Sequence, residues 1–205
     1  MQEFKVHELW PIPIYENFID VKYEWLEKSK NVNYELMHTK NGYISEDRYI
    51  LNQVPDLKEQ IIKHCEYFTK KYMGTTDKVN FYLQNSWFLR HKKNDWGQIH
   101  YHSNSLLSGV YYLKTPPNSG NINFHKNCLH MNMFPPSIRM ENDIKNHFTA
   151  EQYSLTPQEG LIIIFPAHLE HSIDTNKSDH TRYSCAFNFY LKGSLGKEEY
   201  ILEIK

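Results

Sequence analysis

The chain has few of the features that mark membrane-spanning, disulfide-bonded or highly charged proteins. None of its apolar runs approaches the roughly 20 residues that a bilayer-spanning helix needs, and its first residues, MQEFKVHELW, lack the basic and then apolar layout of a secretory signal. Its three cysteines, Cys65, Cys128 and Cys185, form no CxxC motif, which argues against a zinc knuckle or a disulfide framework. Its 23 basic and 24 acidic residues nearly balance, which disfavours duplex nucleic acid as a partner. We therefore expect a cytoplasmic protein with no membrane partner.

Length and composition fit a single globular domain. At roughly 150 residues per domain, a chain of 205 residues accommodates one domain with embellishments. Hydrophobic residues make up 40% of the chain and charged residues 23%, which excludes wholesale disorder. We expect one domain over residues 1–205, with an N-terminal extended and helical layer (1–78), a β core (79–193) and a C-terminal segment (194–205) able to add a strand at a sheet edge.

The N-terminal layer contains two predicted helices. Residues 8–19 are interrupted by prolines and indicate an extended segment, whereas residues 21–30 predict a short helix. Residues 31–53 are polar and rich in turn formers. The segment after them predicts an amphipathic helix with Asp56 as its N-cap and Gly74 at its end. Its apolar positions at helical spacing are Leu57, Ile61, Cys65 and Phe68.

From residue 79 the hydrophobic pattern becomes that of β-strands. Short strands are predicted at residues 79–90, 99–105, 108–114, 121–125, 153–157, 160–166 and 182–191. Short strands behind a helical layer predict an all-β sandwich or barrel core. The connection between residues 125 and 153 is long, and loops of that length are often functional.

Two pairs of histidines are candidates for metal binding. His100 and His102 lie two apart in a predicted strand, where alternate side chains share a face, so both imidazoles can bind one cation. The segment FPAHLEHSI brings His168 and His171 into a loop, and one of them would complete a facial site of three ligands. Either pair alone is weak evidence, because surface, loop or hydrogen-bonded histidines produce the same pattern. Other histidines, such as His91, have no ligand spacing.

The last predicted strand carries an arginine that needs an anion. Arg182, Ser184, Ala186 and Asn188 share one face of this strand. An inward-pointing guanidinium without a partner is costly, and a carboxylate satisfies it through two hydrogen bonds to which a serine hydroxyl can add a third. An internal salt bridge or simple exposure of Arg182 would satisfy the same pattern.

The order and spacing of these motifs resemble those of the non-haem Fe(II), 2-oxoglutarate-dependent dioxygenases, especially a small bacterial and phage group of them. The resemblance rests on HYHSNSLLSGVYYLKTPPNSGNINF (100–124), GLIIIFPAHLEHSI (160–173) and RYSCAFNFYL (182–191), with weaker likeness in ELWPIPIY (8–15) and ISEDRYIL (44–51). It implies a mainly β fold with N-terminal helices around a double-stranded β-helix, the jelly roll of cupin-like proteins. It also implies Fe(II), 2-oxoglutarate and O2 as cofactor and cosubstrates.

The resemblance assigns the metal ligands. His100 takes the first ligand position and His171 the distal one, with His168 as a competitor for it. His102 falls where the family usually has a carboxylate. Three interpretations remain open: His102 is the ligand, Asn104 takes its place, or the site binds metal poorly. We favour His102 because imidazole is a far better ligand than a neutral amide.

The resemblance also assigns the residues that bind the cosubstrate. Arg182 takes the position that clamps the distal carboxylate of 2-oxoglutarate, and Ser184 fits the companion hydroxyl. Asn85, with Trp87 two residues further on, resembles an Asn-x-aromatic pair that holds the cosubstrate in some members. One of the two adjacent tyrosines on the following strand must face inward, and Tyr111 is assigned to the cosubstrate site.

The implied activity is hydroxylation of an unidentified substrate, with release of succinate and CO2. Two alternatives are a three-histidine, cupin-like dioxygenase or isomerase that does not use 2-oxoglutarate, and a non-catalytic jelly-roll binding module. The sequence reveals neither the small-molecule or peptide substrate nor the oligomeric state. We expect the substrate contacts on segments 31–53 and 126–152.

Overall fold

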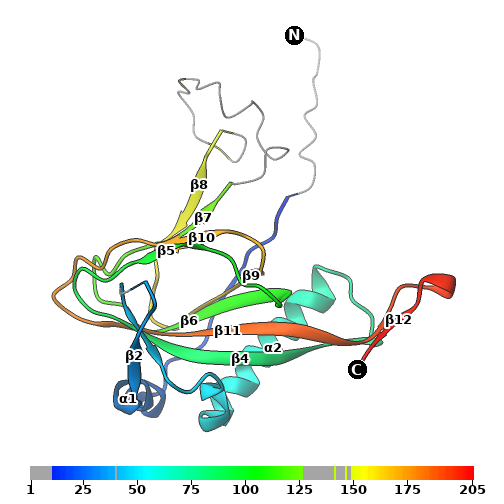
Figure 1. Cartoon of the computed structure of the whole chain (residues 1–205), viewed down its shortest axis with the longest axis horizontal. Helices are drawn as coiled ribbons and strands as arrows, with labels where there is room; N and C mark the ends of the chain where they lie inside the picture. Colours follow the sequence, from blue (N-terminus) through cyan, green and yellow to red (C-terminus); the bar gives the residue numbers. More distant parts are fainter. Residues whose placement is uncertain (1–10, 40, 127–140, 142–145, 147–148) are drawn as a thin grey trace.

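The described strands form two antiparallel β-sheets (Figure 1). The computed structural model describes residues 11–39, 41–126, 141, 146 and 149–205. The larger sheet has the order β1 (Tyr15–Phe18), β9 (Leu161–Pro166), β6 (Leu107–Lys114), β11 (Arg182–Leu195), β4 (Val79–His91), β3 (Tyr43–Ser45) and β2 (Tyr34–Leu36), with β12 (Leu202–Ile204) paired to β11. The smaller sheet has the order β5 (Gly97–His100), β10 (His171–Ile173), β7 (Ile122–His125) and β8 (Gln152–Leu155).

Two α-helices and two short 3-10 helices complete the described structure. They are α1 (Tyr23–Asn31), α2 (Pro55–Lys71), η1 (Ile50–Gln53) and η3 (Glu198–Tyr200). The arrangement confirms the expected mainly β fold with N-terminal helices. Among the described residues, no helix is both long enough and apolar enough to cross a membrane.

One face of the larger sheet packs against the two helices. Cys185, Phe187 and Phe189 of strand β11 enter this core. The apolar positions of α2 meet them, and Trp25 of α1 is only 1% exposed. Because residues two apart in a strand share a face, the intervening residues of β11 must point the other way.

The opposite face of the larger sheet packs against the smaller sheet. Val110, Tyr112 and Phe165 from the larger sheet form a second core with Ile122 and Phe124 of β7. The interior between the two sheets is therefore apolar over much of its area. The polar residues of β11, Arg182, Ser184 and Asn188, also face this interior and are buried.

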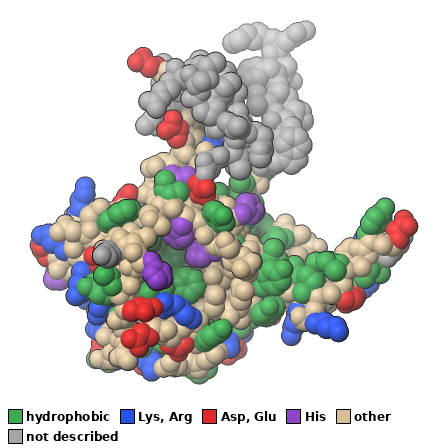
Figure 2. All heavy atoms as spheres, in the orientation of Figure 1, with side chains coloured by type: hydrophobic (Ala, Val, Ile, Leu, Met, Phe, Trp, Pro, Cys, Tyr) green, Lys and Arg blue, Asp and Glu red, His purple; other side chains and the backbone are tan. Residues whose placement is uncertain are grey.

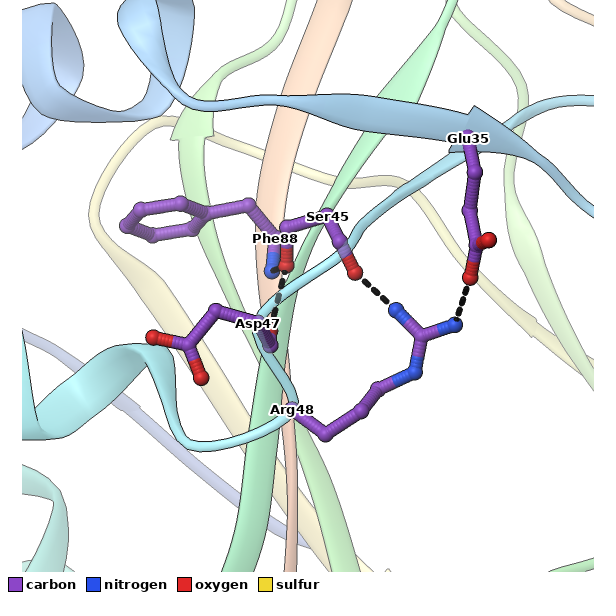
Figure 3. A network of polar contacts seen from close by, with 5 residues as sticks. All are labelled: Glu35, Ser45, Asp47, Arg48 and Phe88. Carbon is purple, nitrogen blue, oxygen red and sulfur yellow. Dashed lines mark hydrogen bonds and ion pairs between the residues drawn. The ribbon is translucent and has the colours of Figure 1, made fainter.

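The β2–β3 hairpin is fastened to the edge of the larger sheet by a polar network (Figure 3). The Arg48 guanidinium donates to the Glu35 carboxylate and to the Ser45 carbonyl. The Ser45 hydroxyl donates to the Asp47 carbonyl at 2.8 Å and accepts the Phe88 N–H at 3.0 Å. Residues 31–53, predicted as turn-rich, thus contribute two short strands to the sheet.

Three local predictions differ from the structure. Helix α2 begins at Pro55 with Val54 as its N-cap, so Asp56 lies in the first turn, where it forms an ion pair with Lys22 at 2.9 Å. The helix ends at Lys71, before Gly74. The strand predicted over residues 99–105 is instead β5, which ends at residue 100. The expected strand in the C-terminal segment is confirmed, since β12 pairs with β11.

Candidate active site

Three histidines converge at the edge of the smaller sheet. His100 ends β5 and His171 begins β10, and the two residues are direct cross-strand partners whose ring centroids are 4.3 Å apart. His102 lies beyond the strand, where its backbone N–H donates to the Ala167 carbonyl at 2.9 Å. Its ring stacks on His171 with centroids 5.2 Å apart. The candidate ligand nitrogens of all three lie within 4.8 Å of one another.

The convergence does not arise in the way that the sequence predicts. His102 is not on the strand of His100, so the shared face of a strand cannot align the two rings. The backbone hydrogen bond from His102 to the Ala167 carbonyl positions this residue instead, and a turn follows in which Asn104 has the positive φ of 56°. Asn104 and His168 are both exposed, whereas His102 and His171 are half-buried and buried. Histidine side chains gather around a recess in the middle of the face shown in Figure 2.

Hydrogen bonds orient two of the three rings for metal binding. The Nδ1 of His100 lies 2.8 Å from the Gln98 carbonyl oxygen, and the Nδ1 of His171 lies 3.0 Å from that of Leu169. A carbonyl oxygen only accepts, so each Nδ1 carries the proton. In the neutral tautomer with its proton on Nδ1, the Nε2 atom carries the free lone pair that binds a metal ion.

Burial keeps the inner histidines neutral. Desolvation, with the nearby His100 as a smaller cause, lowers the pKa of His171 to about 3 and that of His102 to about 4. Both imidazoles are therefore unprotonated at neutral pH. A metal ion does not have to displace protons from them.

Aromatic residues wall the histidine cluster. The Trp87 ring lies 6.0 Å from the His102 ring, and Phe165 meets His171 edge-on at 4.8 Å. Phe124 lies 6.2 Å from His171. These walls exclude water from one side of the cluster and strengthen electrostatic interactions within it.

Arg182 is buried without an anionic partner. Its side chain is 1% exposed, and its Nη1 donates to the carbonyls of Ser119 at 2.8 Å and Gly120 at 3.0 Å. Its Nε has no hydrogen-bond partner, and no carboxylate in the described part of the chain forms an ion pair with it. Burial lowers the pKa of Arg182, the charge of nearby Asp174 acts in the opposite direction without forming an ion pair, and a guanidinium stays charged in proteins. A buried, unpaired cation of this kind calls for an anionic ligand.

Ser184 and Tyr112 lie beside Arg182. They are cross-strand partners on β11 and β6, and both are buried on the interior face. Neither hydroxyl has a hydrogen-bond partner among the residues that the structure describes. Burial raises the pKa of Tyr112 to about 12, so its phenol remains a proton donor. Both hydroxyls can therefore donate to an anion held by Arg182.

The assignment of Tyr111 to the cosubstrate site is wrong. Tyr111 lies on the opposite face of β6, where its hydroxyl donates to the Ile19 carbonyl at 3.1 Å and its ring packs edge-on against Trp25. It is a fully buried member of the core beneath the helices. Because successive strand residues point to opposite faces, Tyr112 takes the interior position.

Asn85 faces the interior but has a structural partner. Its Oδ1 accepts the Nδ2 of its cross-strand partner Asn188 at 2.9 Å, and the Oδ1 of Asn188 accepts the Ser108 hydroxyl at 2.7 Å. This chain of bonds joins β4, β11 and β6. Trp87 lies two residues further along the same face of β4, as the spacing predicts.

Residues 85–188, slightly more than half of the chain, match the sequence model of a family described as "Putative 2OG-Fe(II) oxygenase". The chain belongs to this family. The three histidines, Arg182 and Ser184 all lie within the matched segment. The cofactor and cosubstrates of these 2-oxoglutarate-Fe(II) oxygenases are Fe(II), 2-oxoglutarate and O2, as expected. No curated protein matches the chain.

Solved structures of such oxygenases share the fold. A 2OG-Fe(II) oxygenase family protein from Burkholderia pseudomallei is 15% identical, with a TM-score of 0.55 over 81% of this chain and 75% of that one. The carbocyclase SnoK from nogalamycin biosynthesis is 10% identical, with a TM-score of 0.60 over 87% and 80%. HygX from Streptomyces hygroscopicus, solved with nickel and 2-oxoglutarate, is 9% identical, with a TM-score of 0.59 over 87% and 82%. These likenesses confirm the jelly-roll core.

The site residues of this oxygenase fit Fe(II) and 2-oxoglutarate, which its family uses. Three imidazoles, two of them with hydrogen bonds that orient their Nε2 atoms, suit Fe(II). The unpaired Nε of Arg182 and the two free hydroxyls beside it suit a carboxylate. Sequence reasoning missed Tyr112 in this group, although strand alternation already required one of the two tyrosines to face inward. Much of segment 126–152, where substrate contacts are expected, lies outside the described residues.

Proposed function

We propose that this oxygenase hydroxylates a C–H bond of a substrate that enters beside the three histidines. His100, His102 and His171 are the metal ligands in this proposal. Arg182 binds the distal carboxylate of 2-oxoglutarate with the hydroxyls of Ser184 and Tyr112. The observation that carries the proposal is the pairing of a three-imidazole cluster with a buried, unpaired arginine on the facing sheet.

The charges of the site support a dianionic cosubstrate. Among the described residues, the histidine cluster contains no carboxylate, so its ligands would leave the charge of Fe(II) uncompensated. Arg182 adds a further positive charge to the same interior. A dianion such as 2-oxoglutarate offsets the charges of metal and arginine, and a buried charge is tolerated only when it is paired.

Each residue has a separate task in the proposed reaction. Bound Fe(II) and 2-oxoglutarate supply the oxidative chemistry, which yields succinate and CO2. The Nδ1–H groups of His100 and His171 hold those rings against backbone carbonyls, which fixes the direction of their lone pairs. Trp87 and Phe165 exclude water beside the cluster. Asn85 retains free amide hydrogens toward the interior and is a candidate donor to the cosubstrate.

One observation favours a second function. A set of three histidines without a carboxylate is also the ligand set expected of a cupin-like dioxygenase that does not use 2-oxoglutarate. That alternative leaves the unpaired Arg182 without an explanation. We therefore place it second, and binding of 2-oxoglutarate separates the two.

The test is an anaerobic titration of the Fe(II)-loaded protein with 2-oxoglutarate, followed by the visible charge-transfer band of the chelate. We expect the band in the wild type and in His168→Ala, a matched control whose histidine is exposed and outside the cluster. His102→Ala and His171→Ala are expected to lose iron and the band together.

Each outcome has one meaning. A wild type that binds iron but gives no band moves the protein to the three-histidine alternative. A wild type that binds no iron removes both enzymatic proposals and leaves a binding module. A His102→Ala variant that keeps the full band shows that His102 is not a ligand, and Asn104 would then be tested.

A further inference from the structure

A second buried group without a partner lies beside Arg182. His91 ends β4 and is the direct cross-strand partner of Arg182 on β11. It is 1% exposed, and neither Nδ1 nor Nε2 of its ring has a hydrogen-bond partner within the described residues. Its backbone carbonyl, by contrast, is satisfied by the Nδ2 of Asn176 at 2.9 Å.

An imidazole buried in this way lacks a hydrogen-bond partner. Buried polar side chains are almost always hydrogen-bonded, and an unpaired one costs free energy. Here the unpaired atoms, the ring nitrogens of His91 and the Nε of Arg182, belong to direct cross-strand partners. Two adjacent residues with unmet donors on one face indicate a common missing acceptor.

The surroundings of His91 show which ring atom meets that acceptor. A Cβ placed on Gly42 would lie 3.1 Å from Cδ2 and 3.2 Å from Nε2 of His91, so this edge of the ring lies against the backbone at Gly42. Nδ1 is on the other edge of the imidazole. We therefore assign Nδ1 as the atom that meets a ligand in the interior.

The ligand must be an anion. Burial, and then the positive charge of Arg182, holds the pKa of His91 well below its ordinary value, so the ring is neutral and offers one N–H donor. A cation would be repelled by Arg182. A carboxylate has two oxygens and can accept from a guanidinium and an imidazole N–H together.

We propose that His91 donates its Nδ1–H to the distal carboxylate of 2-oxoglutarate, beside Arg182, and so helps to select a 2-oxo diacid over a 2-oxo monoacid. This inference rests on the proposed function, because it takes 2-oxoglutarate as the ligand of Arg182. It makes His91 a specificity-determining residue that recognises the end of the cosubstrate remote from the metal.

The test compares two ligands on the Zn(II)-substituted protein by calorimetry. 2-Oxoglutarate carries the distal carboxylate, and 2-oxobutyrate lacks it. We expect His91→Phe to weaken 2-oxoglutarate by roughly 10- to 100-fold, the range for a hydrogen bond to a charged group, and to leave 2-oxobutyrate unchanged. His91→Asn places an amide N–H near the position of Nδ1, and we expect it to restore most of the affinity. His180→Phe removes an exposed histidine and is the matched control.

A second measurement needs no variant. In wild-type protein labelled with 15N-histidine, a protected Nδ1–H resonance is expected to appear with 2-oxoglutarate and not with 2-oxobutyrate. This readout keeps the inference testable if His91→Phe does not fold.

The outcomes separate this inference from the proposed function. A wild type that binds Zn(II) but not 2-oxoglutarate refutes the proposed function itself. A wild type that binds 2-oxoglutarate, with a folded His91→Phe of equal affinity, refutes only the role of His91. Equal weakening of both ligands in His91→Phe makes His91 a structural residue and also overturns the inference, as does the absence of the resonance.

Discussion

Replacing Arg182 by Met separates the stability of the fold from the affinity for the cosubstrate. The substitution removes the two hydrogen bonds from Nη1 and leaves the carbonyls of Ser119 and Gly120 without a donor, at a cost of about 1–3 kcal/mol each. It also removes a buried, unpaired cation, whose burial costs several kcal/mol. The two effects oppose each other. We expect the ligand-free variant to be within about 2 kcal/mol of the wild type, since such replacements are often neutral or stabilising.

In contrast to the stability, the affinity for 2-oxoglutarate is expected to fall strongly in Arg182→Met. Loss of a buried charge partner costs about 2–5 kcal/mol, which weakens binding by about 30- to 4,000-fold. At a ligand concentration 100 times the wild-type dissociation constant, binding stabilises the wild type by about 2.7 kcal/mol. At the same concentration Arg182→Met gains at most about 0.9 kcal/mol. With about 2–4 °C per kcal/mol for a chain of this size, the shift in melting temperature falls from about 5–11 °C to below about 4 °C.

The assay is thermal unfolding of the Zn(II)-loaded protein with and without 2-oxoglutarate. Arg48→Met is the matched control, because Arg48 lies in the edge network of Figure 3, away from the interior face. We expect it to keep the wild-type shift. An Arg182→Met variant that retains the full shift refutes the carboxylate role. A ligand-free variant destabilised by more than about 5 kcal/mol refutes the reasoning on the unpaired charge.

Three further predictions concern packing, the position of the metal and pH. Gly109→Ala is expected to lower the free energy of unfolding by about 1–3 kcal/mol in urea, because the new Cβ would lie 2.6 Å from the Ile163 carbonyl oxygen; an unchanged value would mean a looser sheet. Co(II) bound to the histidine cluster is expected to quench the fluorescence of Trp87, which lies beside His102, so Trp87→Phe should abolish most of this quenching. Trp25→Phe, in the core beneath the helices, should leave the quenching intact. Burial and a neighbouring guanidinium keep the pKa of His91 well below its ordinary value in the folded protein, so only the unfolded chain takes up this proton as the pH falls through about 6.5. Lowering the pH from 7 to 5.5 should therefore cost the metal-free wild type about 1.3 kcal/mol more than His91→Phe, and equal losses would contradict a neutral, buried ring.

Local patterns predicted the strands of the β core, and the family resemblance predicted the convergence of His100 with His171. A strand of β-branched and aromatic residues can be predicted from the sequence, because its alternation and the turns that flank it are local properties of the sequence. The location of His102 was predicted for an incorrect reason. His102 lies beyond β5, and its backbone N–H donates to the carbonyl of Ala167, which is far along the chain.

The error at Tyr111, and the silence of the sequence on the surroundings of His91, have a different origin. Strand β6 is buried on both faces, so its sequence does not indicate which face meets the helices and which meets the smaller sheet. Only the strand register places His91 beside Arg182, which is 91 residues away in the sequence. No spacing rule within a strand or loop contains that pairing. Such long-range register is decided by the packing of whole sheets.

The register of β11 explains how one strand serves both the core and the site. Its odd-numbered residues from Cys185 to Phe189 are apolar and fill the core beneath the helices, and this burial fixes the register. The even-numbered residues are then forced into the interior, where Arg182 meets His91 and Ser184 meets Tyr112. A slip by one residue would place the guanidinium in the apolar core and the phenyl rings in the polar interior. Hydrophobic burial on one face of β11 therefore provides the free energy that holds an unpaired cation on the other, ready for an anionic ligand.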